Sequence, residues 1–434
     1  MRTVDVLVVG GGLAGLVAAA FAAKGGAGVR LLEASPEFGG RARTRTVAGY
    51  HLNQGAHAFY CGGFLDTALK DLGVAAVAGK TPALASGFLV DGDTLHQAPF
   101  RAAGLAGTTL LSEAEKGELA RLFRRLRDPS TQTAPGTVDD ALGALSPSPK
   151  VRAVLAAMIR LTSLVHAPTT ADGPALLDQL RGGLTRNALY LDGGWGTLIE
   201  GLRSACAALG ADLRTSRRVE RIEPGPPWRA TLADGTAMTA GAVILAVPPS
   251  QAAALHPAIG ALPSVVDATP ARVACLDLGL ASLPRPDVLF ALGVDRPLYF
   301  SVHSAAARLA PAGGALVHLV RYLEPGETPA RGHLAELEAF MDLLQPGWRG
   351  HERARQVLPA MPAISAIPLA AHGGLNARPP VAVPNAEGLF LAGDWIGPAG
   401  LLADAAAASA RAAGEGAAAF ARALTASRGR RQRG

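Results

Sequence analysis

Three glycines near the start of the chain have the spacing of a dinucleotide-binding turn. Gly10, Gly12 and Gly15 form a G-x-G-x-x-G pattern between an apolar run and a stretch of small residues. The first of these runs predicts a buried strand and the second predicts a helix. The first glycine allows a tight turn, the second lets a pyrophosphate approach the backbone, and the third lets helix and strand pack closely. The phosphates would lie at the helix N-terminus, where free N–H groups point.

Glu33 adds a second feature of such a site. It ends another apolar run, 18 residues after Gly15. A carboxylate there can accept hydrogen bonds from both hydroxyls of an adenosine ribose that carries no 2′-phosphate. The alternative is a glycine turn that merely packs a helix on a strand. The combination with Glu33 favours a dinucleotide site.

The elements that must position these residues come from both ends of the chain. We expect strands over 4–9 and 29–32 and a helix beginning near residue 13. At the other end, a predicted strand over 388–394 ends on Asp394, and a helix over about 403–424 follows a glycine-rich loop. One domain must therefore be assembled from both ends.

The middle of the chain predicts several further elements. Ser112 to Glu115 has the spacing of a capping box, and the helix that follows carries leucines on one face and arginines elsewhere. An amphipathic helix is the preferred interpretation, and a basic helix resting on a membrane is the alternative. Other helices are expected over 151–165, 198–209 and 334–344. Strands are expected over 219–222, 228–232, 237–239 and 242–246, with a hairpin turn at Asp234-Gly235.

Composition indicates a globular protein with two or three domains, and one discontinuous domain is the alternative. The chain has 434 residues, of which 49% are hydrophobic, so it can bury substantial cores. Much of the net charge of +6 lies in residues 428–434, which we expect to be a solvated, frayed tail. The tail has no interleaved aromatic residues, so we expect no nucleic-acid partner. Contact with anionic lipid remains the alternative.

Cysteine usage predicts a reducing compartment. Cys61, Cys206 and Cys275 stand far apart and form no C-x-x-C pair, which excludes a zinc site, so we expect no bound metal. No stretch reaches the roughly 18 apolar residues of a membrane span, and the opening strand leaves no room for a signal peptide. We expect a cytoplasmic protein, with peripheral membrane contact as the alternative.

Four motifs in this order resemble those of the FAD-dependent amine oxidase and phytoene desaturase superfamily, and the stretches 299–303 and 310–314 resemble its bacterial phytoene-desaturase-like branch. The four motifs are the opening glycine pattern with Glu33, Gly39-Gly40-Arg41, the turn Gly193-Gly194-Trp195-Gly196, and Ala392-Gly393-Asp394. The resemblance implies an α/β fold with a discontinuous, Rossmann-like FAD-binding domain and an α+β substrate domain. The implied boundaries are 1–85, 190–262 and 380–427 for the FAD-binding domain, 86–189 and 263–379 for the substrate domain, and 428–434 for a basic tail.

The resemblance also implies a set of contacts to FAD. Arg41 would bind phosphate, Val219 would present its backbone to the adenine, and Asp394 would bind the ribityl or pyrophosphate end. The segment from Gly55 to His57 would pass the isoalloxazine ring. The residues implied to contact FAD are Gly10, Gly12, Leu13, Ala14, Gly15, Glu33, Ala34, Gly40, Arg41, Gly55, Ala56, His57, Val219, Gly393, Asp394, Leu401 and Leu402.

Two of these contacts have a specific chemical consequence. Leu401 and Leu402 begin the last helix, whose N–H groups would face the flavin pyrimidine and stabilise the negative charge of a reduced flavin.

The chain departs from the family pattern at Asn53, where an acid is frequent, and at Ala410, where a glycine is common. Neither departure removes a flavin contact.

The distribution of lysine separates the branches of the superfamily. The five lysines all lie at or before residue 150. Amine oxidases of this family generally place a lysine beside flavin N5 in the later part of the chain, and arginine cannot release a proton in its place. The resemblance therefore favours a desaturase or dehydrogenase over an amine oxidase.

The implied reaction transfers a hydride from an apolar, isoprenoid or carotenoid-like molecule to flavin N5. We expect His57 and Trp195 to face the ring, with a structural histidine and a packing role as the respective alternatives. Arg160 and His166 are weaker candidates for the substrate slot. No second strand-linked glycine pattern offers a nicotinamide site, so oxygen or a quinone would re-oxidise the flavin.

Two other functions are kept as alternatives. One is a protoporphyrinogen-oxidase-like or amine-oxidase-like flavoenzyme. The other, from a different class, is a prenyl-binding protein of the GDP-dissociation-inhibitor type, which uses no flavin. Glu33, Arg41 and Asp394 argue against the second, because a protein without FAD has no reason to keep them together.

Overall fold

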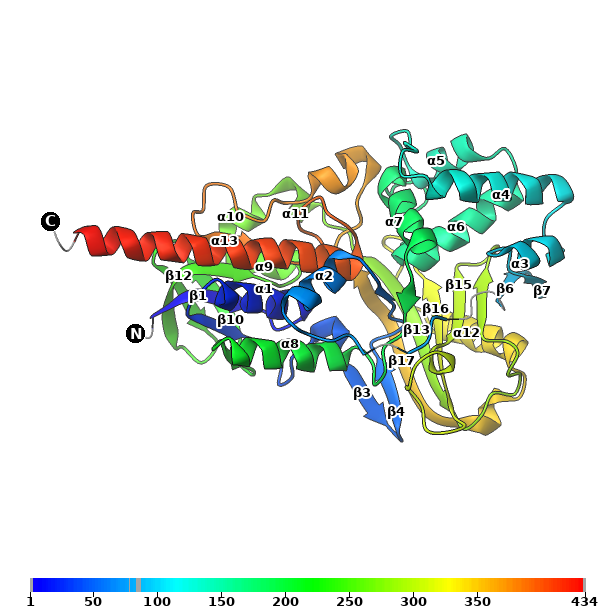
Figure 1. Ribbon diagram of the computed structural model, residues 1–434, viewed down its shortest axis with the longest axis horizontal. Helices are drawn as coiled ribbons and strands as arrows, with labels where there is room; N and C mark the ends of the chain where they lie inside the picture. The colour runs from blue at the N-terminus through cyan, green and yellow to red at the C-terminus, as the bar shows by residue number, and fades with distance from the viewer. Residues whose placement is uncertain (1–2, 78, 83–86, 432–434) are drawn as a thin grey trace.

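The structure, a computed structural model, describes residues 3–77, 79–82 and 87–431 and contains two large sheets, each covered by helices (Figure 1). The first sheet has the order β10-β11-β12-β1-β2-β9, with β18 beside β12. Its central pairs are parallel, and β10, β11 and β12 are antiparallel. Its strands are β1 (Thr3–Val9), β2 (Val29–Leu32), β9 (Asp212–Arg214), β10 (Val219–Glu223), β11 (Trp228–Leu232), β12 (Ala237–Leu245) and β18 (Leu389–Leu391).

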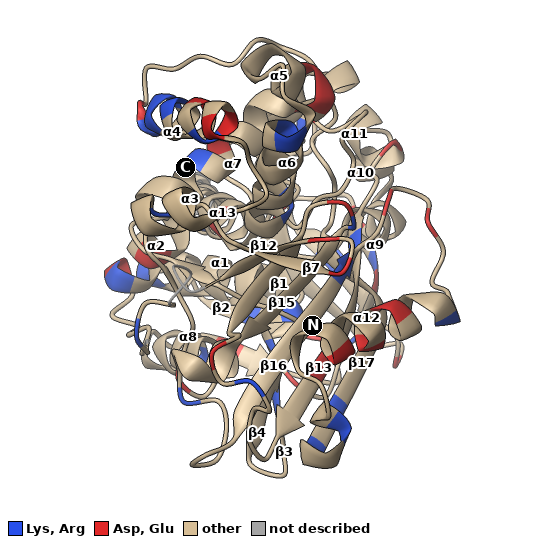
Figure 2. Cartoon of the chain, turned by 90° about the vertical axis from the view of Figure 1, so that its right-hand side faces the viewer, with Lys and Arg blue, Asp and Glu red and all other residues tan. Residues whose placement is uncertain are grey.

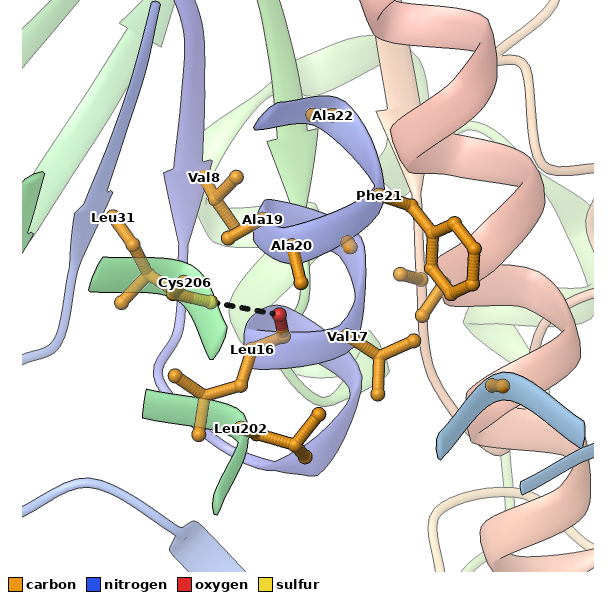
Figure 3. Close-up of a cluster of buried hydrophobic side chains, with 14 of the residues drawn as sticks. Val8, Leu16, Val17, Ala19, Ala20, Phe21, Ala22, Leu31, Leu202 and Cys206 are labelled. Carbon is orange, nitrogen blue, oxygen red and sulfur yellow. Dashed lines mark hydrogen bonds between the residues drawn. The ribbon is translucent and has the colours of Figure 1, made fainter. Parts of the chain in front are cut away.

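Small residues let the helices on the first sheet pack closely. Helix α1 is buried along most of its length, and Ala18 to Ala20 are fully enclosed. Figure 3 shows its core contacts, including the hydrogen bond from Cys206 Sγ to Leu16 O at 3.4 Å. Long helix α13 lies along α1 (Figure 1). The helices on this sheet are α1 (Leu13–Lys24), α2 (Phe64–Asp71), α8 (Gly196–Ala208), α9 (Pro249–Leu255), α10 (Pro257–Gly260), α11 (Pro263–Val266) and α13 (Leu402–Arg431).

The second sheet has the order β17-β13-β16-β15-β14-β6-β7. It is antiparallel except where β14 runs parallel to β6. Its strands are β6 (Phe88–Asp91), β7 (Thr94–Gln97), β13 (Ala271–Leu280), β14 (Phe290–Gly293), β15 (Leu298–Val302), β16 (Ala315–Tyr322) and β17 (Glu352–Ile364).

Helices cover both faces of the second sheet, because side chains along each strand alternate between two apolar cores. One face packs on α12, as Leu276 and Leu278 do with Phe340. The other face, with Cys275 and Val320, packs on a bundle of helices. These helices are α12 (Arg331–Leu344) on the first face, and α3 (Ala102–Gly107), α4 (Glu113–Arg127), α5 (Val138–Leu145), α6 (Pro149–Ser163) and α7 (Gly173–Thr185) on the second.

Shorter elements connect the two sheets. Two small antiparallel pairs are present: β3 (Thr44–Val47) forms a hairpin with β4 (Tyr50–Asn53), and β5 (Phe59–Tyr60) pairs with the distant β8 (Ala188–Leu189). Single turns of 3-10 helix are η1 (Gly40–Ala42), η3 (His303–Ala305), η4 (Trp348–His351), η5 (Ala370–His372) and η6 (Gly374–Ala377).

The helices and strands that the sequence patterns predict are present, but several of them begin or end at other residues than expected. The capping box of α4 is confirmed, with Ser112 and Glu115 bonding to each other's backbone. The strands expected over 237–239 and 242–246 are one strand, β12, because Ala240 between them pairs with both neighbouring strands, opposite Val4 and Trp228. Helix α13 continues through residues 428–431, expected to be frayed, since arginine is a good helix former. The last three residues of that tail lie outside the described part of the chain.

Helix α4 has the amphipathic pattern that its sequence predicts. Leu119, Leu122, Phe123 and Leu126 are buried, and the arginines on the opposite side are exposed. Figure 2 shows acidic residues beside the basic ones on this helix. Over the described residues, no helix combines the length and the apolar character needed to cross a membrane. The same residues contain no group of three or more metal-ligating side chains.

Candidate cofactor and substrate site

In the glycine turn between β1 and α1, the three glycines have the different roles that their spacing predicts. Gly10 has φ +103°, and a Cβ on it would lie 2.4 Å from Ala246 O. A Cβ on Gly15 would lie 1.8 Å from Gly10 O. A Cβ on Gly12, in contrast, would have no neighbour nearer than 4.0 Å. The first and third glycines therefore allow the chain to pack, and the second leaves open space for a ligand.

Glu33 binds the backbone around this turn. Its carboxylate accepts hydrogen bonds from Gly11 N at 2.6 Å and Ser35 N at 2.7 Å. Its predicted contact to ribose would use the remaining lone pairs of the same oxygens. The residue after Glu33 is part of the lining of a pocket. Its lining residues are Ala34, Ser216, Arg217, Arg218, Leu232, Ala233 and Asp234. Val219, predicted to meet the adenine, follows this pocket directly at the start of β10.

Arg41 and Asp394, far apart in sequence, form an ion pair. Arg41 Nη1 lies 2.9 Å from Asp394 Oδ2 and donates a second hydrogen bond to Ala363 O at 3.1 Å. Asp394 is 2% exposed, and its Oδ2 also accepts from Ser365 N. Burial by itself would raise the pKa of Asp394, but Arg41 and Ser365 hold that pKa below its ordinary value. Asp394 is therefore an anion at neutral pH.

These residues fit the FAD that the resemblance implies. Asp394 Oδ1 is buried without a hydrogen-bond partner, so one more donor, such as a ribityl hydroxyl, is needed there. Next to it, Gly393 N donates to Ser409 Oγ at 3.0 Å, which fixes the start of α13 against the end of β18. Leu401 is buried, and α13 begins at Leu402 with free backbone N–H groups. The chain thus offers free N–H groups at a helix N-terminus and an unpaired acceptor on Asp394, and both fit FAD.

The segment 53–57 connects this cradle to the second sheet. Gly55 has φ +77°, and a Cβ on it would lie 2.9 Å from Cys275 Sγ of β13. Asn53 Oδ1 accepts hydrogen bonds from Trp195 N at 3.0 Å and from Thr44 Oγ1 at 2.7 Å. An acid at position 53 would bind the same donors, so the asparagine keeps the geometry without the charge.

His57 and Trp195, both predicted to face the flavin ring, lie with their own ring centroids 5.1 Å apart. His57 Nδ1 lies 3.1 Å from Gly55 O. Burial lowers the pKa of His57 to about 4, so its imidazole is neutral at physiological pH. Trp195 is 3% exposed and belongs to the core of the first sheet, which is the packing role kept as its alternative.

Sequence reasoning missed a polar cluster on the second sheet. Asp277 of β13 and His318 of β16 are both fully buried, and His318 Nδ1 lies 2.6 Å from Asp277 Oδ1. Gln356 of β17 donates its amide to Asp277 Oδ2 at 2.8 Å and to Asn53 O at 2.6 Å. The signal in the sequence was a charged or ionisable residue inside each of two apolar strands.

Side chains from β15, from η3 that follows it and from Tyr190 after β8 continue this cluster. The ring of His303 stacks on Tyr190 at 3.6 Å and lies 4.3 Å from the ring of His318. Tyr299 OH lies 3.1 Å from His303 Nε2, and Tyr190 OH lies 3.2 Å from Ser301 Oγ. Burial, together with His318 and His57, lowers the pKa of His303 well below its ordinary value.

Arg160 and His166 lie toward the other end of the same sheet. Arg160 is 8% exposed, donates from Nη2 to Gly293 O at 2.9 Å, and has no carboxylate partner. Burial lowers its pKa, and the hydroxyl of nearby Tyr322 is also buried without a partner. Tyr322 stands four residues beyond His318 on β16, which is about 13 Å along a strand. The two predicted slot residues are therefore separate from His57.

Comparison with known proteins gives a family match over most of the chain. Residues 13–272 match the model of the family described as flavin containing amine oxidoreductase. No curated protein matches the sequence.

Solved structures share the fold at low sequence identity. An oxidoreductase from Methanosarcina mazei is 18% identical with a TM-score of 0.72, over 94% of this chain and 99% of that one. A putative protoporphyrinogen oxidase from Exiguobacterium sp. 255-15 is 18% identical with a TM-score of 0.71, over 96% and 99%. A putrescine oxidase bound to putrescine is 16% identical with a TM-score of 0.69, over 95% and 98%.

Proposed function

The chain belongs to the flavin-containing amine oxidoreductase family and is an FAD-dependent oxidoreductase, and we propose that it removes a hydride from an apolar, isoprenoid or carotenoid-like substrate rather than from an amine. The observation that carries this proposal is the chemistry of the sheet face between the second sheet and helices α4 to α7. Apolar and tyrosine side chains fill the core that is packed there, and Val273, Tyr299 and Val320 are all buried in it.

An amine substrate has no free counter-ion on this face. An ammonium group taken out of water needs a carboxylate. Among the buried described residues the carboxylates are Asp277 and Asp394, and Asp277 is already bonded through both oxygens. Arg160, a buried cation, would repel an ammonium. No lysine follows residue 150, so the chain also lacks the base that amine oxidases of the family it resembles use.

The residues of this chain have distinct roles in the proposed reaction. FAD supplies the hydride acceptor when it is bound. Arg41 and the glycine turn would hold its phosphates, Glu33 its ribose, and Asp394 its ribityl chain. The apolar face would align the substrate and exclude water, and His57 would meet the ring as a neutral imidazole. We propose oxygen or a quinone as the acceptor that completes the cycle.

Anaerobic bleaching of the flavin tests this proposal, because it reports the reductive half-reaction alone. The purified holoenzyme would be mixed separately with an isoprenoid polyene, with putrescine and with protoporphyrinogen. The flavin absorbance at about 450 nm would be followed in each mixture. We expect the polyene to bleach the flavin and putrescine to leave it oxidised. Bleaching by the amine alone would contradict the proposal.

A cyclic tetrapyrrole precursor is the second candidate substrate, and Arg160 is the observation that favours it. A buried guanidinium without a carboxylate can pair with an acidic side chain of such a molecule. Under this alternative, Arg160→Met abolishes bleaching by protoporphyrinogen. Under the first proposal, the same variant leaves bleaching by the polyene intact.

The flavin-free, prenyl-binding alternative is not favoured. The family match is to flavin-containing oxidoreductases, and the buried Asp394 Oδ1, which has no partner among the described residues, fits a ligand that donates a hydrogen bond. A yellow preparation that releases FAD on denaturation is the expected result. A colourless protein that cannot be reconstituted with FAD would restore this alternative.

A further inference from the structure

Asp277, His318 and His303, which we call the buried relay, form an arrangement that FAD binding does not explain. Asp277 and His318 face each other across paired strands β13 and β16. Both are 0% exposed, and their side chains are 2.6 Å apart. Enclosing a carboxylate so completely is costly unless every oxygen is bonded. Here His318 and Gln356 provide those bonds.

Two ring nitrogens of the relay are left unpartnered. His318 Nε2 and His303 Nδ1 are both buried and have no hydrogen-bond partner among the described residues. The two imidazole rings are in direct contact, with their centroids 4.3 Å apart. The carboxylate of Asp277 favours the tautomer of His318 with its proton on Nδ1, and this leaves the Nε2 lone pair free.

The relay lies directly behind the segment that the resemblance places beside the isoalloxazine ring. Gln356 joins Asp277 to the backbone of that segment at Asn53. Gly55 packs against Cys275, which stands two residues before Asp277 on the same strand. His57 ends the segment and packs against Trp195. No other buried carboxylate–imidazole pair occurs within the described residues.

We propose that the buried relay accepts and holds the proton that the substrate loses when its hydride leaves. This inference rests on the proposed function, because a proton is released only if the reaction is a dehydrogenation. One C–H bond breaks with its electron pair, and the hydride passes to the flavin, which is the oxidant. The neighbouring C–H bond breaks heterolytically, and its electron pair becomes the new π bond.

The proton from that second bond goes to the relay, where Asp277 stabilises the resulting imidazolium. Reduction of the acceptor then consumes two electrons and two protons, one of them from the relay. The relay thus takes the place of the lysine that this chain lacks. Neither the cradle for FAD nor the apolar face needs to change for this role.

Counting protons tests the relay in the holoenzyme. The flavin would be reduced anaerobically by the best compound of the substrate panel, in weak buffer containing a pH indicator. We expect no proton release from the wild type and one proton per reduced flavin from Asp277→Asn, whose amide cannot stabilise an imidazolium. His303→Gln, which removes one acceptor nitrogen, serves as the second variant if Asp277→Asn does not fold.

A matched control and a second measurement keep the outcomes distinct. His256→Gln removes another buried imidazole with an unpartnered Nε2, located in the first sheet domain, and should release no proton. Release of one proton by the wild type, or equal counts in wild type and Asp277→Asn, would overturn the proposal.

Nitrogen NMR of the histidine-labelled apoprotein decides the same point without any substrate. We expect His318 to carry its proton on Nδ1, with Nε2 free, and to lose that preference in Asp277→Asn. A proton on Nε2 would overturn the relay even if a substrate reduces the flavin. If no compound reduces the flavin, the proposed function fails, and the NMR result still decides whether the relay can accept a proton.

Discussion

Alanine substitutions at Gly12 and Gly15 should separate cofactor binding from stability, although the added group is the same methyl. A Cβ at Gly15 would lie 1.8 Å from Gly10 O, so the helix or the turn must move by more than 1 Å. We expect Gly15→Ala to lower the free energy of unfolding of the apoprotein by about 3 kcal/mol, the upper range for overpacking. A Cβ at Gly12 meets nothing nearer than 4.0 Å, and Gly12 has φ −75°, which alanine adopts readily.

Gly12→Ala should therefore fold with wild-type stability, within about 0.5 kcal/mol. Its methyl occupies the space through which a pyrophosphate reaches the backbone. We expect the Kd for FAD to rise by ten- to a hundredfold, about 1.4 to 2.7 kcal/mol. Urea unfolding of both apoproteins and fluorescence titration with FAD measure the two effects. An unchanged Kd in Gly12→Ala, or wild-type stability in Gly15→Ala, would refute the reasoning.

Three further predictions follow from the charges and packing of the site. Arg41→Met should destabilise the apoprotein by about 2 kcal/mol at pH 7, less than the loss of a fully buried pair because Arg41 is partly exposed. The lowered pKa of Asp394 stabilises the fold above about pH 4, and this stabilisation is lost as the carboxylate becomes protonated below that pH. Urea unfolding should therefore show the difference in stability between the variant and the wild type shrinking below about pH 4. The pKa of His57 is lowered to about 4 in the folded protein, so the unfolded chain binds a proton first and the folded state loses stability as the pH falls from about 6.5 to 4. In the same assay, His57→Gln should recover up to about 3 kcal/mol at pH 4 and little at pH 8. Gly414→Ala should lower the melting temperature, since its Cβ would lie 2.5 Å from Ala18 O where α13 meets α1, whereas Gly332→Ala, in open space on α12, should not.

Much of the nucleotide-binding half could be predicted from sequence, because its signals are local. A glycine turn between a strand and a helix is specified by residues within one short stretch, and the turn at Gly10 to Gly15 has the expected geometry. The capping box of α4 is equally local. The hairpin of β3 and β4 and helix α5 were missed, since short elements carry little periodicity. Helix α7 was missed although it has 13 residues, because Pro174, Gly182 and Gly183 weaken its helical signal. Domain limits, the individual FAD contacts and the location in the cell stay predictions.

The polar cluster near the flavin segment could not be predicted in the same way. Asp277, His303 and His318 each read as an isolated polar residue in an apolar run, and only the register of β13, β15 and β16 brings them together. The link from Gln356 to Asn53 spans 303 positions. Pairing across strands depends on how distant segments are packed, and no local pattern encodes it.

The sequence by itself determined the dinucleotide turn, the acid that follows it and the family resemblance, because each depends on residue types at short, fixed spacing. Only the tertiary structure decided that Arg41 and Asp394 form one ion pair, that His57 meets Trp195, and that a carboxylate and two imidazoles are enclosed behind them. The physical reason is that a buried charge is tolerated only where distant chain segments supply its partners.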